Sequence, residues 1–267
     1  MTKGEFRPLS YLFYKLNIWL CGTAVLMVVA SAVALSIPVR SVGSGLLLAP
    51  LLFYVLYVED RRSASDEDWI NDPNRTWIVQ QYRTELFRTE LVALAGYQLL
   101  LVSHILGNSG HGVGYWLLGQ LPFVVLTIYG SLKRYPTFDS IAVGATWAFM
   151  IVFSLVVSTG QPVTRSLLVV FVGWFLITFA GVESRNAQDL DGDSAVDKTT
   201  LAGYLGATAT RRMERLLKAL GVGLFWYIGG FQAAGVVVIY LLLLCVFRGR
   251  TQQAGRSAVF ADRPKPQ

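Results

Sequence analysis

The sequence predicts an all-α, polytopic membrane protein, a bundle of about eight transmembrane helices around a central cavity. Its 267 residues are 54% hydrophobic and only 15% charged, whereas a soluble domain carries about a quarter charged residues. The mean hydropathy is +0.49. Apolar stretches of membrane-crossing length recur along the chain, and the charged residues gather between them. These observations place much of the chain in contact with lipid.

Several stretches reach or approach the roughly 17 to 25 residues that a membrane-crossing helix needs. They are 16–37, 44–58, 88–107, 113–130, 138–159, 164–182, 214–231 and 232–248. The first is predicted to be a membrane helix, because no small-residue cleavage site leads into a soluble mature domain. The last two are separated at Gly229, Gly230 and Gln232, since glycine breaks helices and a polar amide prefers the membrane interface.

The charged residues predict the orientation of these helices. Cytoplasmic loops collect Lys and Arg, and an N-terminus inside leaves only Arg40 and Arg165 of the 23 Lys and Arg residues outside. All 17 Asp and Glu residues then fall on the inner side or at inner helix ends. We therefore expect a multi-pass protein of the cytoplasmic membrane with both termini inside. The net charge of +6 suits loops beside an anionic leaflet and requires no nucleic acid.

The chain is predicted to hold one domain. Residues 1–248 form the transmembrane domain, and the polar residues 249–267 form a disordered cytoplasmic tail. The inner loops 59–87 and 183–213 are long and charged, so function is expected at the cytoplasmic side. The two cysteines lie in apolar runs, which excludes a disulfide framework.

The segment after 164–182 reads ESRNAQDLDGDSAVDKTTLAGYLG. Asp189, Asp193 and Asp197 are spaced by four, so on a helix they share one face. Like charges at this spacing destabilise a helix, and Mg²⁺, which binds carboxylate and phosphate oxygens, would offset them. Asn186 lies one turn earlier and adds a neutral oxygen. The alternative is a solvated acidic loop.

The segment after 44–58 reads YVEDRRSASDEDWINDPNRTW. Asp60, Asp68 and Asp72 follow a similar four-residue ladder, with Ala64 in the missing position, and Asp66 and Glu67 lie nearby. Basic residues are interleaved in both acidic segments, namely Arg61, Arg62, Arg75, Arg185 and Lys198. Arginine forks match phosphate oxygens, so the two segments together predict a metal–diphosphate site.

At this point the sequence resembles the UbiA-type intramembrane prenyltransferases. That family carries two Asp-rich motifs, after its second and sixth membrane helices, where both acidic segments lie here. The second motif looks like DxxDxxxDxxxGxxTLP. Asp189, Asp193, Thr200 and Leu201 match it. Asn186 replaces the leading Asp, and Asp197 replaces a Gly.

The first family motif looks like NDxxDxxxD followed, after four residues, by PxR. Asp68, Pro73 and Arg75 match it, whereas Ala64 stands at the middle Asp and Asp60 at the leading Asn. Either Asp60, Asp66 or Glu67 substitutes as a ligand, or metal binding on this side is weakened. A third similarity is the run Tyr129-Gly-Ser-Leu132-Lys133-Arg134, which looks like the family's Tyr and LKR segment, whose basic groups contact diphosphate.

The resemblance implies Mg²⁺-dependent transfer of a prenyl group from a polyprenyl diphosphate to a lipophilic acceptor within the membrane. The implied catalytic residues are Asp189, Asp193 and Asp68. The implied metal ligands are Asp60, Asp68, Asp189 and Asp193. The implied diphosphate-binding residues are Arg75, Lys133, Arg134, Arg185 and Lys198. The acceptor and the prenyl chain length stay open.

Two alternatives remain at this stage. One is a UbiA-like protein that cyclises its prenyl diphosphate, or binds it without turnover, and the other is a transporter. A transporter would carry polar groups at mid-membrane depth, of which the stretches show few. Among other residues, Glu90 is left open between a functional and a structural role. Asp139, His104 and His111 are interpreted as structural.

Overall fold

The computed structural model describes residues 18–63, 66–108, 110, 112–132, 135, 137–190, 193 and 200–257. Within these residues the elements are helical and no strand occurs. They are α2 (Trp19–Ala34), α3 (Val39–Val42), η1 (Gly43–Leu47), α4 (Leu48–Arg62), α5 (Asp66–Asn71), α6 (Pro73–Gln81), α7 (Arg83–Gly107), α8 (Val113–Gly119), α9 (Leu121–Leu132), α10 (Phe138–Thr159), α11 (Arg165–Asn186) and α13 (Leu201–Ser257).

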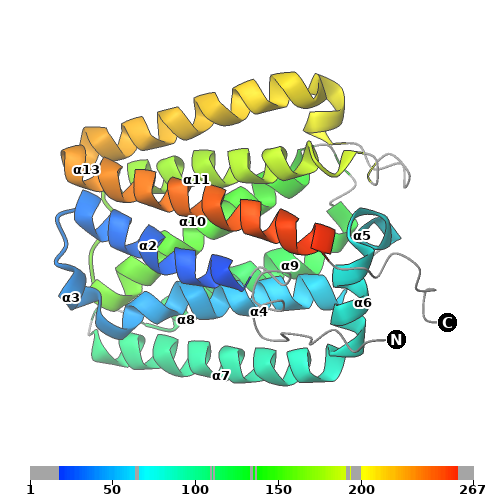
Figure 1. The fold of residues 1–267 in the computed structure, drawn as a ribbon. Helices are drawn as coiled ribbons and strands as arrows, with labels where there is room; N and C mark the ends of the chain where they lie inside the picture. Colours follow the sequence, from blue (N-terminus) through cyan, green and yellow to red (C-terminus); the bar gives the residue numbers. More distant parts are fainter. Residues whose placement is uncertain are drawn as a thin grey trace.

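The long helices lie side by side in one bundle, and the short helices α5 and α6 lie together at one end of it (Figure 1). Five helices are long and apolar enough to cross a membrane: Val39–Arg62, Arg83–Gly107, Phe138–Thr159, Arg165–Asn186 and Leu201–Phe247. Two shorter apolar helices, Trp19–Ala34 and Val113–Tyr129, complete the set. The predicted all-α membrane bundle is confirmed.

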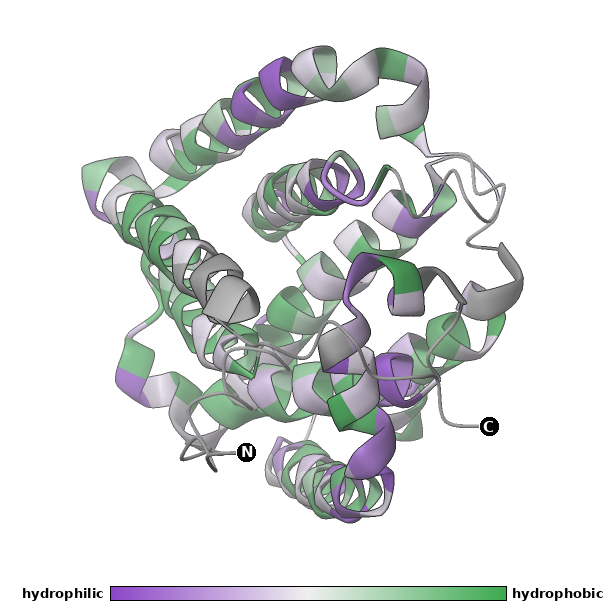
Figure 2. Ribbon diagram, turned by 45° about the vertical axis from the view of Figure 1, so that its right-hand side comes forward, coloured by the Kyte–Doolittle hydropathy of each residue, from purple (hydrophilic) through white to green (hydrophobic). Residues whose placement is uncertain are grey.

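The side chains on the outside of the bundle are apolar as well. Val92, Leu99 and Leu106 on α7 are 74%, 73% and 81% exposed, and Figure 2 shows apolar residues along the flanks of the long helices. Large side chains such as Trp174 and Met27 are fully buried inside. A surface this apolar is unusual for a soluble monomer. It is the kind of surface that a protein presents to the lipid tails of a membrane.

Helix α13 combines two of the predicted stretches and breaks where the sequence indicated. Gly230 has φ 62° and ψ −156°, a conformation that is open only to glycine. Helix α13 begins at Leu201 and ends at Ser257, and its membrane-crossing part is Leu201–Phe247. The predicted start at 214 is therefore too late, whereas the predicted end at 248 agrees within one residue. The charged residues of its first turns lowered the hydropathy there without preventing a helix. The tail predicted to be disordered begins at residue 249. Residues 249–257 continue α13, and residues 258–267 lie outside the described part of the chain.

The predicted stretch 113–130 is divided into α8 and α9 at Gln120, just before Pro122. Proline cannot donate a backbone hydrogen bond and is tolerated in the first helical turn. The Gln98 side-chain amide donates to Gln120 Oε1 at 2.9 Å, and Tyr97 donates its hydroxyl to the Gly119 carbonyl at 2.8 Å. These bonds satisfy polar groups inside the apolar region.

Helices α11 and α13 approach closely at a pair of glycines. A Cβ atom on Gly221 would lie 2.6 Å from Ile177 Cγ1 and 3.0 Å from the Gly173 carbonyl oxygen. A Cβ on Gly173 would lie 2.8 Å from Phe225 Cε2. Any side chain at either glycine therefore pushes the two helices apart, which makes this contact a fixed point of the bundle.

We predict that Gly221→Ala destabilises the fold by about 1–3 kcal/mol, the usual effect of an overpacked interior. The matched control is Gly223→Ala on the same helix, where a Cβ meets no atom within 4 Å. That change should be neutral, or stabilising by up to ~1 kcal/mol through helix propensity. The midpoint of thermal unfolding in detergent measures both, and equal midpoints would contradict the close approach.

Candidate active site

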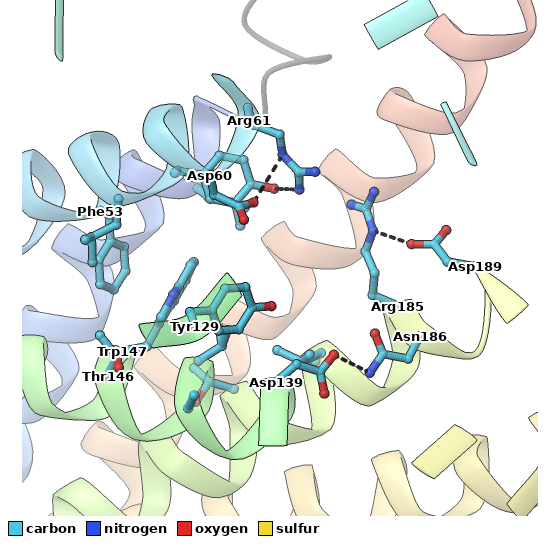
Figure 3. A pocket seen from close by; sticks show the side chains of 18 of the residues that line it. Phe53, Asp60, Arg61, Tyr129, Asp139, Thr146, Trp147, Arg185, Asn186 and Asp189 are labelled. Atoms are coloured by element: carbon cyan, nitrogen blue, oxygen red, sulfur yellow. Dashed lines mark hydrogen bonds and ion pairs between the residues drawn. The ribbon is translucent and has the colours of Figure 1, made fainter. Parts of the chain in front are cut away.

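One cavity of about 540 Å³ opens at the end of the bundle where α4 and α11 finish and α10 begins. Its volume lies in the range of small-molecule sites. Its polar end is lined by Asp60, Arg61, Asp68, Asn71, Asp72, Arg75, Asp139, Arg185, Asn186, Gln188, Asp189 and Asp193. Its deeper walls are mainly apolar and aromatic. Figure 3 shows the labelled polar side chains from several elements around the same space.

The first acidic segment folds into α5 and α6 at the cavity entrance. Asp68 on α5 accepts hydrogen bonds from Arg75 at 2.9 Å and from Arg61 at 3.4 Å. Asp72 is the N-cap of α6 and accepts from the Arg75 backbone N–H at 3.1 Å, with Pro73 at the first helical position. Asp72 therefore ends one helix and starts the next, whereas Asp68 faces the basic groups.

The second acidic segment continues the backbone path of α11 past its last residue. The Asp189 backbone N–H donates to the Arg185 carbonyl at 3.1 Å, and the Asp193 N–H donates to the Asp189 carbonyl at 3.0 Å. These i to i+4 bonds preserve the predicted shared face of Asp189 and Asp193. Arg185 Nε donates to Asp189 Oδ2 at 3.2 Å, and Asp193 is only 2% exposed.

The basic residues at this end are crowded and poorly solvated. Arg75 is 3% exposed, and its burial, together with the positive charges of Arg61 and Arg185, lowers its pKa to about 10. The guanidinium therefore stays protonated at neutral pH, but under repulsion from its neighbours. Such a cluster favours a multivalent anion, because each arginine offers a planar fork of donors for phosphate oxygens.

A second polar cluster is buried where α10 meets α11. Asp139 is 4% exposed, Glu183 0% and Asn186 6%. Asn186 Nδ2 donates to Asp139 Oδ2 at 3.1 Å, and the Ser140 backbone N–H donates to Asp139 Oδ1 at 2.7 Å. The Ser140 hydroxyl donates to Glu183. Asp139 does lie in the first turn of α10, as predicted, but it also lines the cavity, which its position in the sequence did not reveal.

The structure adds cavity residues that the sequence did not indicate. Glu214 and Lys218 form an ion pair on α13 and line the cavity, near the start of the predicted stretch 214–231. Deeper in the cavity, the rings of Phe53 and Trp147 are 4.0 Å apart between centroids. The i, i+4 spacing of Glu214 and Lys218 was the available signal, but nothing in the sequence shows which face of α13 turns inward.

The structure brings most of the predicted site residues together. The cavity is lined by Asp60, Asp68, Arg75, Arg185, Asp189 and Asp193. Lys133, Arg134, Asp197 and Lys198 lie outside the described residues, as does Ala64, and the side chains of Asp66 and Glu67 are also outside them.

Two of the other residues considered in the sequence have structural partners. Arg62 donates to Glu90 at 2.5 Å and links α4 to α7 away from the cavity. His104 Nε2 lies 3.2 Å from the Ser44 hydroxyl. His111 lies outside the described residues.

The carboxylates at the cavity are suitable donors for a hard divalent cation, although they do not form a cage by themselves. Among the described residues, no three His, Cys, Asp or Glu side chains gather closely enough to hold a metal ion. Mg²⁺ usually binds one or two protein carboxylates together with substrate phosphate oxygens. Asp189 and Asp193, with the Asn186 amide oxygen, therefore have the chemistry to share such a cation with a bound diphosphate.

A model of the UbiA prenyltransferase family matches residues 82–259. The chain belongs to the UbiA prenyltransferase family. The matched range includes the second acidic segment but begins after the first. The first acidic segment is the one that departs more from the family pattern. With its apolar helices of membrane-crossing length, the chain is an integral membrane protein.

A solved structure of a UbiA homolog from Archaeoglobus fulgidus bound to DMAPP and Mg²⁺ has a similar fold. The two chains are 14% identical with a TM-score of 0.52, and the match covers 94% of this chain and 88% of the homolog. At this identity the similarity shows the fold alone. No curated protein matches the chain significantly.

We predict that inorganic diphosphate raises the thermal stability of the protein, because the anion relieves the repulsion among Arg61, Arg75 and Arg185. A ligand at about 100 times its Kd stabilises by about 2.7 kcal/mol. Arg75→Gln should remove most of this shift. Arg83→Gln, a change at an exposed arginine on α7, is the control and should keep it. A full shift in Arg75→Gln would exclude Arg75 from anion binding.

Proposed function

We propose that this protein catalyses Mg²⁺-dependent transfer of a prenyl group from a polyprenyl diphosphate to a lipophilic acceptor within the membrane. The observation that carries the proposal is that one cavity joins a cluster of arginines and aspartates to an apolar and aromatic interior. A prenyl diphosphate has the same division into a charged head and an apolar tail. Family membership and the homolog bound to DMAPP and Mg²⁺ support the assignment.

The diphosphate belongs at the polar end of the cavity. Arg61, Arg75 and Arg185 would bind its oxygens by charge-assisted hydrogen bonds, and Lys133, Arg134 and Lys198 are expected to add further positive charge. Asp189 and Asp193 would hold Mg²⁺, with Asp68 and Asp60 as ligands from the other side. When bound, the cation neutralises charge that develops on the leaving diphosphate.

The prenyl tail belongs in the deeper part of the cavity. Trp147 follows Asp139 by eight residues on α10, which corresponds to a depth of about 12 Å at the helical rise. Leu126, Trp147 and Ile177 line this part and would keep water away from the prenyl tail.

The chemistry proposed for this site is a substitution at the first carbon of the prenyl chain. The bond from this carbon to the diphosphate oxygen breaks, and its electron pair leaves with the diphosphate. The acceptor's nucleophilic atom forms a bond to the same carbon and loses a proton. The arginines stabilise the departing charge by preorganised donors in a water-poor site, where such interactions are strong.

Two other activities remain to be separated from prenyl transfer by experiment. A cyclase or a non-catalytic binder would share the diphosphate end but need no acceptor, and the departures at Ala64 and Asp60 keep this alternative open. A cyclase would release diphosphate with no acceptor present. A transporter would move a substrate without changing it, so neither a prenylated lipid nor free diphosphate would form.

Mass spectrometry of lipids from cells with and without the protein tests the proposal. The wild type should yield a prenylated lipid, and EDTA should abolish the transfer in isolated membranes until Mg²⁺ is restored. Asp189→Asn and Asp193→Asn should abolish turnover, since a lost metal ligand raises the barrier by several kcal/mol and each 1.36 kcal/mol is tenfold in rate. Asp68→Asn should be severe, and Asp60→Asn milder because an amide oxygen can still bind.

The control for these variants is Glu85→Gln, a change at an exposed carboxylate on α7, which should keep full activity. All variants are compared at equal protein level. Full prenyl transfer by Asp189→Asn and Asp193→Asn would refute the role of these two carboxylates in holding Mg²⁺. A wild type that forms neither a prenylated lipid nor free diphosphate would refute the prenyltransferase assignment and favour the transporter.

We also propose that the cavity opens to the cytoplasm, because 21 of the 23 Lys and Arg residues lie on that side in the predicted eight-helix topology. The test uses a background in which Cys21 and Cys245 are replaced by Ala. A single cysteine at Ser63, at the cavity end, should be labelled from the cytoplasm, and one at Gln161, between α10 and α11, from the outside. Labelling of both from one side would refute the orientation.

A further inference from the structure

We propose that Asp139 is a positioning residue, which fixes the Asn186 side chain so that its amide oxygen faces the cation and diphosphate end of the cavity. This inference rests on the proposed function and extends it to a residue outside both acidic segments. It also gives a physical reason why an asparagine stands where the family motif has its leading aspartate.

The geometry is set by hydrogen bonds between α10 and α11. Asn186 Nδ2 lies 3.1 Å from Asp139 Oδ2 and 3.4 Å from the Ser140 hydroxyl. The second Asp139 oxygen, Oδ1, accepts the Ser140 backbone N–H at 2.7 Å. Both carboxylate oxygens of Asp139 are therefore engaged. Figure 3 shows the Asn186 nitrogen turned to Asp139 and its oxygen on the side where Arg185 lies.

The orientation of the amide follows from what each group can donate. An ionised carboxylate only accepts hydrogen bonds, whereas an amide has one donor end and one acceptor end. Asp139 must therefore face the nitrogen of Asn186, which leaves the oxygen for the cavity. The reversed amide would place two acceptors against each other in a buried site and direct N–H groups at the position that a cation would occupy.

The charge of the cluster explains the choice of asparagine. Asp139 and Glu183 are both nearly inaccessible to solvent, and the Ser140 hydroxyl bridges them, lying 3.2 Å from Asp139 Oδ1 and donating to Glu183. An aspartate at 186 would add a third acidic side chain within contact distance of Asp139. Like charges in a buried site destabilise each other, so the neutral amide supplies the oxygen without this repulsion.

The two helices hold the cluster in a fixed frame. A Cβ on Gly144 would lie 3.2 Å from the Phe179 backbone nitrogen, and Thr178 donates its hydroxyl to the Gly144 carbonyl at 3.2 Å. Both contacts lie one to two turns deeper than Asp139 and Asn186. The spacing of α10 and α11 is thus set by backbone contact. This contact also holds Asp139 at a constant distance from Asn186.

The test measures Mg²⁺-dependent binding of inorganic diphosphate to the purified full-length protein, together with its thermal unfolding. In Asp139→Asn, the new amide keeps its oxygen for the Ser140 N–H and turns its nitrogen to Asn186, so Asn186 must flip. Binding should weaken at least tenfold. Asn186→Ala, which removes the oxygen and leaves Asp139 intact, should weaken binding to a similar degree.

The decisive variant exchanges the two residues. In Asp139→Asn/Asn186→Asp, the new amide donates to the new carboxylate, whose second oxygen faces the cavity. Total charge is conserved, so the double variant should bind Mg²⁺ and diphosphate at least as tightly as the wild type. Asn186→Asp alone should unfold at a lower temperature, because it brings the repulsion without the compensating amide.

Unchanged diphosphate binding in Asp139→Asn would overturn the proposal. The proposal would also be overturned if the exchanged variant unfolds at the wild-type temperature but binds diphosphate as weakly as either single variant. If Asp139→Asn does not fold, the exchanged variant and Asn186→Ala still decide. Normal diphosphate binding by a wild type that makes no prenylated lipid would instead refute the prenyl-transfer function and leave the positioning role standing. A wild type that binds no diphosphate with Mg²⁺ would overturn both.

Discussion

The site depends on keeping charged side chains at the end of a cavity whose walls are otherwise apolar. Removing a guanidinium or a carboxylate from water costs several kcal/mol per ion, and the structure offsets this by pairing. Asp68 forms ion pairs with Arg61 and Arg75, and Asp189 forms an ion pair with Arg185. A substrate diphosphate bound with a cation could exchange partners with these pairs, so that no charge is left uncompensated during binding.

Small residues decide how much space lies beneath this charged end. Along α11, Gly173 meets Phe225 and Gly221 of α13, whereas a Cβ on Gly181 would meet no atom within 4 Å. Gly181 lines the cavity. The same helix therefore touches its neighbour at one glycine and leaves room at another, one turn below Arg185. Gly144 brings α10 against α11 in a similar way.

The departures from the family pattern fall unevenly on the two sides of the cavity. On the α11 side, Asp189 and Asp193 retain the motif, and Asn186 is supported by Asp139. On the other side, Ala64 cannot ligate a cation, and Asp68 is held by two arginines. The α11 side is therefore better equipped to hold a cation, and the α5 and α6 side to present arginines to an anion.

The fold class, the break at Gly230 and the two acidic segments could be predicted from the sequence, because hydropathy and residue spacing are properties of the chain. The sequence also indicated the shared face of Asp189 and Asp193. Which charged side chains line the cavity depends on how the helices pack: Asp139 and Glu214 do, whereas Glu90 pairs with Arg62 outside it. The periodicity of a sequence shows which residues share a face of a helix, but not what that face contacts. The packing of α10, α11 and α13 determines which faces line the cavity.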